Sequence, residues 1–137
     1  MQVKEIMSRE VEVIHSNIPV RAAAARMKTL NIGFLPVRDA DRLVGMVTDR
    51  DIVVRAVAGG KDPSKTKVED ILTPDVIYCF EDQDVGEAAK LMQEKRIRRL
   101  IVLNRDKRLA GILSVGDLAV ATGSDKLTGE TVKHVSE

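Results

Sequence analysis

The residues whose types and spacing could do chemistry form a short corner that occurs twice in the chain. In the first copy Gly45 is followed by two apolar residues, then Thr48, two further residues and Asp51. In the second copy Ser114 and Asp117 follow a glycine at the same spacing. The apolar pair indicates the end of a buried strand, and the hydroxyl residue stands where a helix should begin. The aspartate then falls in the first turn of that helix.

Such a corner could bind a nucleotide. The unpaired backbone N–H groups of a helix start suit a phosphate, and the Thr48 hydroxyl could add a hydrogen bond. A carboxylate such as Asp51 can accept hydrogen bonds from ribose hydroxyls, and glycine before the strand lets a ligand or another backbone come close. The same spacing is also a helix capping box, which satisfies backbone N–H groups and nothing more. The residues alone favour the cap, and the two roles can coexist.

An internal repeat surrounds both corners, and repeats of this kind decide the fold. Shifting the chain by 65 residues pairs Val3 with Val68, and nine further positions match identically. One extra residue near Asp106 shifts the offset to 66, after which the corner glycines and Asp51 with Asp117 align. Most matches are apolar or turn residues, so the repeat mainly describes a core.

Length and composition bound the answer. A chain of 137 residues suffices for one compact domain, whereas a half of about 60 residues would be marginal alone, so the halves should share a core. A hydrophobic content of 44% and a net charge of +1 favour a globular protein without a general attraction to nucleic acid or acidic membranes. The apolar runs are too short to span a membrane, and no signal-peptide core is present, which predicts a cytoplasmic protein.

Each half is predicted to run strand, helix, strand, strand, helix after a short amphipathic lead-in at residues 3–7 or 68–72. Brief β-prone runs at 11–14 and 76–80 precede helices with apolar residues at helical spacing. Pro19 stands near the first helical position of one helix, and Asp84 with Glu87 gives the other a capping-box pattern. Two strands joined by a loop of about five residues then form a hairpin. The fold class is therefore α+β.

The predicted boundaries follow the repeat. The first repeat covers residues 1–60, a linker of glycine, proline and polar residues covers 61–66, and the second repeat covers 67–123. A polar C-terminal tail follows at 124–137, which we expect to be weakly ordered or to dock as a short helix.

At this point the chain resembles a known family. Two copies of a unit with a Leu-Pro-Val or Leu-Ile-Val strand and a Gly-Φ-Φ-[Ser/Thr]-x-x-Asp corner resemble a pair of CBS domains, the Bateman module. The resemblance covers residues 3 to about 123. It implies two repeats packed around a pseudo-two-fold axis, a homodimer of pairs, and adenosine-containing ligands in clefts between the repeats.

The resemblance assigns the hydroxyl of each corner to phosphate and the aspartate to ribose. Basic residues just before the second hairpin, Arg98 and Arg99, match positions that reach ligand phosphates, a role that suits the planar fork of arginine. A solvated charged surface is the alternative reading. The predicted ligand-binding set also contains Arg50 and the apolar residues Val11, Ile14, Leu35 and Pro36.

The first repeat has Gly33 and Phe34 where the second has the two arginines. The sequence therefore predicts unequal clefts. One cleft would combine Thr48 and Asp51 with the arginines, and the other would combine the Ser114 corner with an uncharged wall.

Other chemistry is weakly supported. His15 and His134 lack metal-ligand partners at useful spacing, and the single cysteine, Cys79, cannot form an internal disulfide. We find no nucleophile with a base, no phosphate-binding lysine loop and no metal cluster, so the chain is not expected to be an enzyme or to carry a covalent cofactor or metal.

The leading functional hypothesis is a regulatory sensor that binds AMP, ADP, ATP, NAD or S-adenosylmethionine and changes its affinity for an unidentified regulated protein. The alternative is a ligand-free interaction or oligomerisation module. Neither hypothesis involves a membrane, and nucleic acid is disfavoured because aromatic stacking residues are missing beside the arginines.

Overall fold

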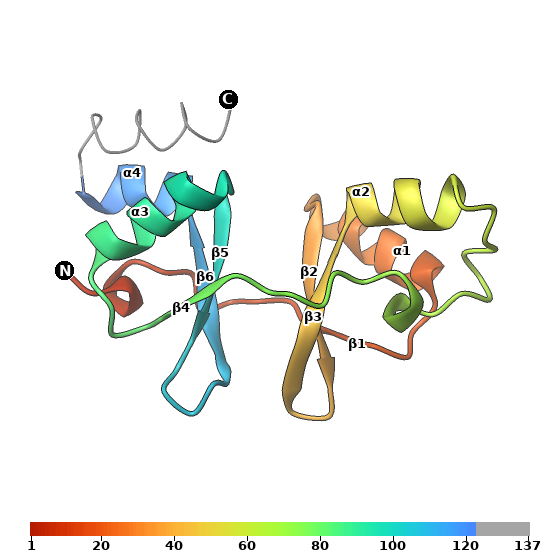
Figure 1. Cartoon of the computed structure of the whole chain (residues 1–137), viewed down its shortest axis with the longest axis horizontal. Coiled ribbons are helices and arrows are strands. Elements are labelled where there is room, and N and C mark those ends of the chain that lie inside the picture. The colour runs from red at the N-terminus through yellow and green to blue at the C-terminus, as the bar shows by residue number, and fades with distance from the viewer. Residues whose placement is uncertain (123–137) are drawn as a thin grey trace. The chain divides into compact units, whose positions relative to one another are not determined.

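The computed structural model describes residues 1–122, which form two compact units (Figure 1). Unit 1 contains Met1–Val11 together with the chain from Ile77 onward, and unit 2 contains Glu12–Val76. Each unit therefore takes its lead-in segment from one sequence repeat and its sheet and helices from the other. The predicted tail at 124–137 lies outside the described residues.

Unit 2 is built on a three-stranded sheet in the order β1-β2-β3. Strand β1 (Ile14–His15) runs parallel to β2 (Phe34–Asp39), and β2 runs antiparallel to β3 (Arg42–Thr48). Helix α1 (Val20–Leu30) connects β1 and β2. The chain leaves β3 through α2 (Asp49–Asp51), which continues as a π-helical segment, η2 (Ile52–Val57). The short 3-10 helix η3 (Val68–Asp70) is the lead-in of the second repeat.

Unit 1 repeats this plan with the order β4-β5-β6. Strand β4 (Tyr78–Phe80) is parallel to β5 (Arg99–Leu103), which is antiparallel to β6 (Leu109–Ser114). Helix α3 (Val85–Lys95) joins β4 to β5, α4 (Val115–Thr122) follows β6, and the 3-10 helix η1 (Val3–Glu5) is the lead-in. The predicted α+β class and the strand, helix, strand, strand, helix order are confirmed in both units.

The helices begin and end where local chemistry dictates. Pro19 is the N-cap of α1, and Asp84 caps α3 by accepting a hydrogen bond from the Gly86 N–H at 3.0 Å. Glu87 does not return the reciprocal bond, because its carboxylate accepts instead from the Gln83 amide at 3.0 Å. Of the two bonds of the predicted capping box, α3 therefore has the one that Asp84 accepts.

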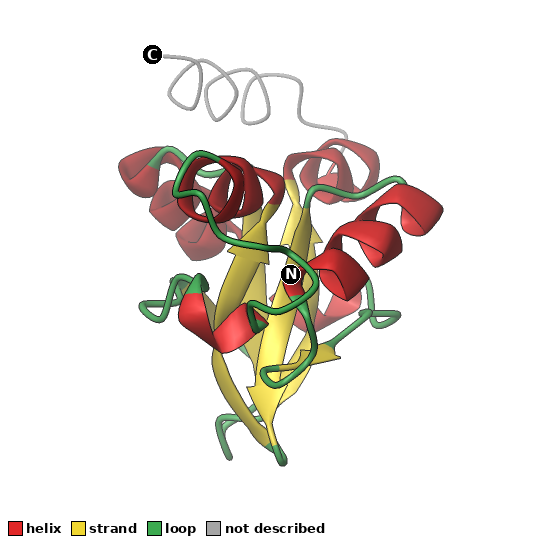
Figure 2. Ribbon diagram, turned by 90° about the vertical axis from the view of Figure 1, so that its right-hand side faces the viewer, coloured by secondary structure: helices red, strands yellow, loops and turns green. Residues whose placement is uncertain are grey.

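In each unit the helices lie on one face of the sheet (Figure 1). Apolar residues at helical spacing face that sheet and are fully buried, for example Val20 and Ala23 in α1 and Ala89 and Met92 in α3. Figure 2, with helices in red and strands in yellow, shows the longer helices toward the ends of the hairpins that lie away from the hairpin loops. Both predicted corners stand at those ends.

The repeated glycines allow another backbone to approach closely. The Met46 N–H donates to the Thr73 carbonyl at 2.9 Å, and the Thr73 N–H donates back at 2.8 Å. A Cβ atom on Gly45 would lie 2.5 Å from that Thr73 carbonyl oxygen. In unit 1 Gly111 has the same relation to the Ser8 carbonyl oxygen, also 2.5 Å. The glycines thus serve the lead-in segments, which place Thr73 and Ser8 beside β3 and β6.

Within residues 1–122, every helix is too short or too polar to cross a lipid bilayer.

Candidate functional site

The corner of unit 1 is a reciprocal helix cap between β6 and α4. The Asp117 N–H donates to Ser114 Oγ at 3.0 Å, and the Ser114 N–H donates to Asp117 Oδ2 at 2.9 Å. The capping interpretation of this spacing is therefore confirmed. Both side chains can still form further hydrogen bonds, because a serine hydroxyl that accepts one bond can donate another, and a carboxylate offers about four acceptor sites.

Arg98 and Arg99 lie beside this cap because of the hairpin register. Arg99 on β5 pairs with Ser114 on β6, and the Val115 N–H donates to the Arg98 carbonyl at 3.1 Å. The two arginines, Ser114, Val115 and Gly116 line a hollow with a volume of about 390 Å³. Two exposed cations thus share one hollow with a hydroxyl group at a helix start, an arrangement that attracts anions.

The corner of unit 2 has the same cap and a more heavily engaged aspartate. The Thr48 N–H donates to Asp51 Oδ2 at 2.9 Å, and the Asp51 N–H donates to Thr48 Oγ1 at 3.1 Å. The Thr73 hydroxyl also lies 3.3 Å from Asp51 Oδ1 and 3.4 Å from Oδ2, and Arg55 Nε lies 3.8 Å from Oδ1. Asp51 is 8% exposed. This carboxylate is therefore mainly a structural group.

The charge beside the unit 2 cap is opposite to that in unit 1. Gly33 and Phe34 stand where unit 1 has the arginines, and the Asp49 N–H donates to the Gly33 carbonyl at 2.9 Å. A Cβ atom on Gly33 would lie 2.9 Å from Asp49 Oδ2, so the carboxylate fills this space. Arg50 is exposed, and its backbone N–H donates to Asp49 Oδ1 at 2.8 Å. An anion would meet a carboxylate here.

The sequence predicts that the arginines face the Thr48 corner across the repeats and that an uncharged wall faces the Ser114 corner, and this pairing of the clefts stays a prediction. It does not include the contact that unit 1 makes within itself. Arg98 and Arg99 belong to the same hollow as Ser114, because the antiparallel register of β5 and β6 places the start of one strand beside the end of the other. The hairpin predicted from the sequence already contains this information. A hairpin pairs the start of its first strand with the end of its second, so the position of the arginines beside Ser114 could have been derived from the predicted hairpin.

The apolar members of the predicted set occupy different environments. Leu35 and Ile14 are buried within the hydrophobic core of unit 2, and Pro36 is buried in β2 opposite Met46. Val11 is half-buried and closes the N-terminal segment of unit 1. Their contact with a ligand stays a prediction.

Two residues that hold Asp51 were missed from the sequence. Thr73 follows the second lead-in, and its counterpart 65 residues earlier is Ser8, another hydroxyl residue. Arg55 lies one helical turn after Asp51, and its Nη1 donates to the Ile71 and Leu72 carbonyls at 3.0 Å each. The matched hydroxyl residues were the available signal for Thr73.

Among residues 1–122, no three His, Cys, Asp or Glu side chains gather closely enough to hold a metal ion. Cys79 is 2% exposed, and burial raises the pKa of its thiol to about 11. The thiol therefore stays neutral near pH 7, which makes it a poor nucleophile.

Comparison with known proteins places this geometry in a family. The model of the CBS domain matches residues 3–57 and again residues 68–123. The uncharacterized protein YlbB of Bacillus subtilis is 35% identical over 138 residues, which cover 99% of this chain and 92% of YlbB. Hypoxic response protein 1 of Mycobacterium tuberculosis is 34% identical over 117 residues, covering 85% of this chain and 81% of that protein.

Solved structures with a similar fold and sequence include proteins of the same kind. The structure of Hypoxic Response Protein I, which has two coordinated zinc ions, matches with a TM-score of 0.78 and 33% identity, covering 88% of this chain and 98% of that chain. The CBS domain pair of protein MJ0100, solved with 5-methylthioadenosine and S-adenosyl-L-methionine, matches with a TM-score of 0.76 and 33% identity, covering 92% and 98%. With its family model matched twice, the chain belongs to the CBS domain family and contains two CBS domains in tandem.

Proposed function

We propose that this chain is a regulatory CBS pair, not an enzyme, and that it binds an adenosine-containing ligand at the Ser114–Asp117 corner of unit 1. One observation carries the proposal, namely the hollow that Arg98, Arg99 and Ser114 line together. The bound adenosine compounds of the MJ0100 pair support this ligand class.

The proposed ligand contacts use the hydrogen-bonding atoms of Ser114 and Asp117 that the helix cap leaves unpaired. The Ser114 oxygen accepts from the Asp117 N–H, so its own proton can be donated to a phosphate oxygen. Asp117 uses Oδ2 for the cap, so Oδ1 can accept from a ribose hydroxyl. The arginines then neutralise the phosphate through charge-assisted hydrogen bonds.

The two cations rank the members of the ligand class. AMP, ADP, ATP and NAD carry phosphates that the arginines can bind. S-adenosylmethionine carries a sulfonium cation, and 5-methylthioadenosine carries no charge. We therefore expect the phosphate-bearing ligands to bind more tightly here than either sulfur compound. At the Thr48–Asp51 corner the Asp49 carboxylate disfavours phosphate, and an uncharged or cationic adenosine compound fits better.

Thermal melting against AMP, ADP, ATP, NAD, S-adenosylmethionine and 5-methylthioadenosine tests the proposal. A ligand that binds only the folded state stabilises it by about 2.7 kcal/mol at a hundredfold excess over Kd. We expect AMP to raise the melting temperature of the wild type, and Ser114→Ala combined with Asp117→Ala to remove most of that shift. If none of the six compounds raises the melting temperature, the ligand-binding proposal is refuted.

A second observation favours self-association through the helices. Val53, Val54 and Val57 in the η2 segment are 58%, 50% and 60% exposed, and Val120 on α4, which matches Val54, is 88% exposed. Exposed apolar side chains that cluster on one helix, as the three valines of η2 do, are typical of interaction surfaces. We propose a homodimer of pairs built through these helices, which Val54→Lys with Val120→Lys should dissociate. A monomeric mass of the wild type by light scattering at micromolar concentration would contradict it.

A further inference from the structure

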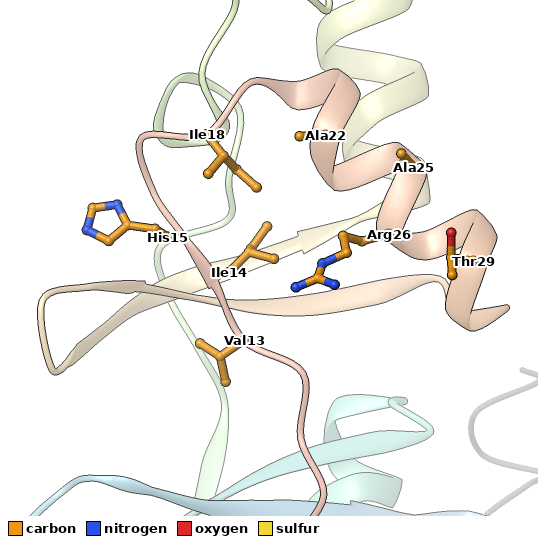
Figure 3. A pocket seen from close by; sticks show the side chains of 8 residues that line it. All are labelled: Val13, Ile14, His15, Ile18, Ala22, Ala25, Arg26 and Thr29. Atoms are coloured by element: carbon orange, nitrogen blue, oxygen red, sulfur yellow. The ribbon is translucent and has the colours of Figure 1, made fainter.

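Unit 2 has a groove that shares no lining residue with the Thr48–Asp51 corner. It lies between the segment around β1 and helix α1 and has a volume of about 480 Å³. Figure 3 shows Ile14 and Ile18 from the β1 side, and Arg26 from the helix, pointing into the space between them, while Ala22 and Ala25 mark the exposed side of α1. The volume falls within the range of small-molecule sites, roughly 300–1,000 Å³.

The groove extends along the helix. A second hollow of about 340 Å³ shares Ala22 and Ala25 with the first and continues toward Pro19 and Arg21. The two alanines therefore form the common wall of one elongated depression. Apolar residues form most of its wall, with Arg26 at the end near Ile14 and Arg21 at the end near Pro19.

The second repeat shows that the fold does not require this groove. The positions of Ala22, Ala25 and Arg26 are occupied 65 residues later by Glu87, Lys90 and Leu91. The counterpart of Ile18 is Gln83, whose amide donates to Glu87 at 3.0 Å. At three of these four positions unit 1 thus carries a long polar side chain where unit 2 carries an apolar one, and at the fourth an apolar leucine stands in place of Arg26. The open groove is a property of these particular residues.

The cation at the groove end is held by a contact that a ligand could replace. Arg26 Nη2 lies 2.6 Å from Glu12 Oε1, and the two side chains are 55% and 36% exposed. Ion pairs as exposed as this one add little to stability. A carboxylate inside the groove could take the place of Glu12 and use the planar fork of the guanidinium.

We propose that the groove binds an amphipathic monocarboxylate. Its carboxylate pairs with Arg26, and its apolar body lies along Ala22 and Ala25 against Ile14 and Ile18. Arg26 is the one arginine or lysine that lines the first hollow, so this end of the groove matches one negative charge. Nucleotides, which carry several charges, therefore belong to the corner of unit 1.

A ¹⁵N NMR titration of the whole chain with hexanoate tests this proposal, with 1-hexanol as the uncharged probe of similar shape. We expect saturable shifts centred on the amides of Ile14, Ala22 and Ala25, and an affinity for hexanoate about tenfold or more above that for hexanol. Arg26→Leu introduces the residue of the matching position in repeat 2 and should make the two probes equal. The control Lys28→Leu removes the same charge from an exposed position of α1 outside the groove and should preserve the preference.

Filling the groove gives an independent check. Ala25→Lys and Ala22→Glu each introduce the residue that the second repeat carries, so at least one should keep the dispersed spectrum of a folded protein while abolishing hexanoate binding. The proposal is overturned if hexanoate causes no saturable shifts in the wild type, or if Arg26→Leu leaves the preference for hexanoate unchanged. It is also overturned if Ala25→Lys alters only the mass of the particle in solution, because the groove would then be a contact with a second copy.

Discussion

Replacing Arg98 by alanine tests the proposed phosphate site with little disturbance of the fold. The Arg98 guanidinium is exposed, and within the described part of the chain no hydrogen bond or ion pair engages it. Its backbone carbonyl, which accepts from the Val115 N–H at 3.1 Å, is unaffected by the change. The melting temperature without ligand should therefore stay nearly constant.

The expected loss of affinity follows from the contact type and its exposure. A hydrogen bond to a charged group contributes about 1.5–3 kcal/mol, and an exposed arginine belongs at the lower end of that range because solvent screens it. A loss of about 1.5 kcal/mol raises Kd about tenfold. The loss should apply to AMP and should leave adenosine, which has no phosphate, almost unchanged.

Isothermal titration with both ligands measures the difference. Arg108→Ala is the matched control, because it removes one positive charge from an exposed position in the hairpin loop of the same unit. Charges beyond about 8 Å are largely screened at physiological ionic strength, so this control should bind AMP as the wild type does. If Arg98→Ala weakens AMP and adenosine equally, or weakens neither, the hollow is not a phosphate site.

Three further results are expected. Asp117→Ala should weaken AMP binding more than Asp51→Ala does. Asp51→Ala should instead destabilise the fold more, by about 2 kcal/mol in urea unfolding, because it removes a cap and a buried acceptor. The reverse order in both assays would show that the two corners are wrongly ranked. Gly111→Ala should lower the free energy of unfolding by about 1–3 kcal/mol, since its Cβ would lie 2.5 Å from a backbone carbonyl oxygen. Gly116→Ala on α4, where the nearest atom is 3.6 Å away, should raise it by up to ~1 kcal/mol. Equal effects would contradict the close approach at Gly111. The raised pKa of Cys79, about 11 against 9.0, means that the unfolded chain loses its thiol proton first, so this group lowers stability as pH rises from 9 to 11; thiol labelling at pH 8 should follow unfolding, and rapid labelling of the folded protein would refute its burial.

The sequence was sufficient to predict the local structure of the corners. The apolar pair, the hydroxyl residue and the aspartate define a strand end followed by a capped helix, and both reciprocal caps are present within 2.9–3.1 Å. These features depend on residues three positions apart. Because backbone geometry relates such neighbours directly, their contacts can be predicted without knowledge of the rest of the fold.

The partners of the lead-in segments could not be predicted in the same way. Internal repetition identifies Thr73 and Ser8 as equivalent residues, but it does not say which copy of the sheet each one joins. In the structure η3 and Thr73 belong to unit 2 with the strands of the first repeat, and η1 and Ser8 belong to unit 1. Thr73 therefore reaches Asp51, and this contact makes Asp51 structural.

The comparison of the two corners separates the residues that build the fold from those that would select a ligand. Both units keep the hydroxyl, the aspartate and the close-approach glycine, each of which has a structural partner. The units differ in the side chains beside the cap, since Arg98 in one unit corresponds to Gly33 in the other, and Val115 corresponds to Asp49. These exchanges change the charge beside the helix start from positive to negative while the cap remains. A repeat that diverges in charge beside a retained cap has the means to bind two different ligands on one scaffold, and the exchange Arg98→Gly with Val115→Asp should transfer the phosphate-rejecting character of unit 2 to unit 1.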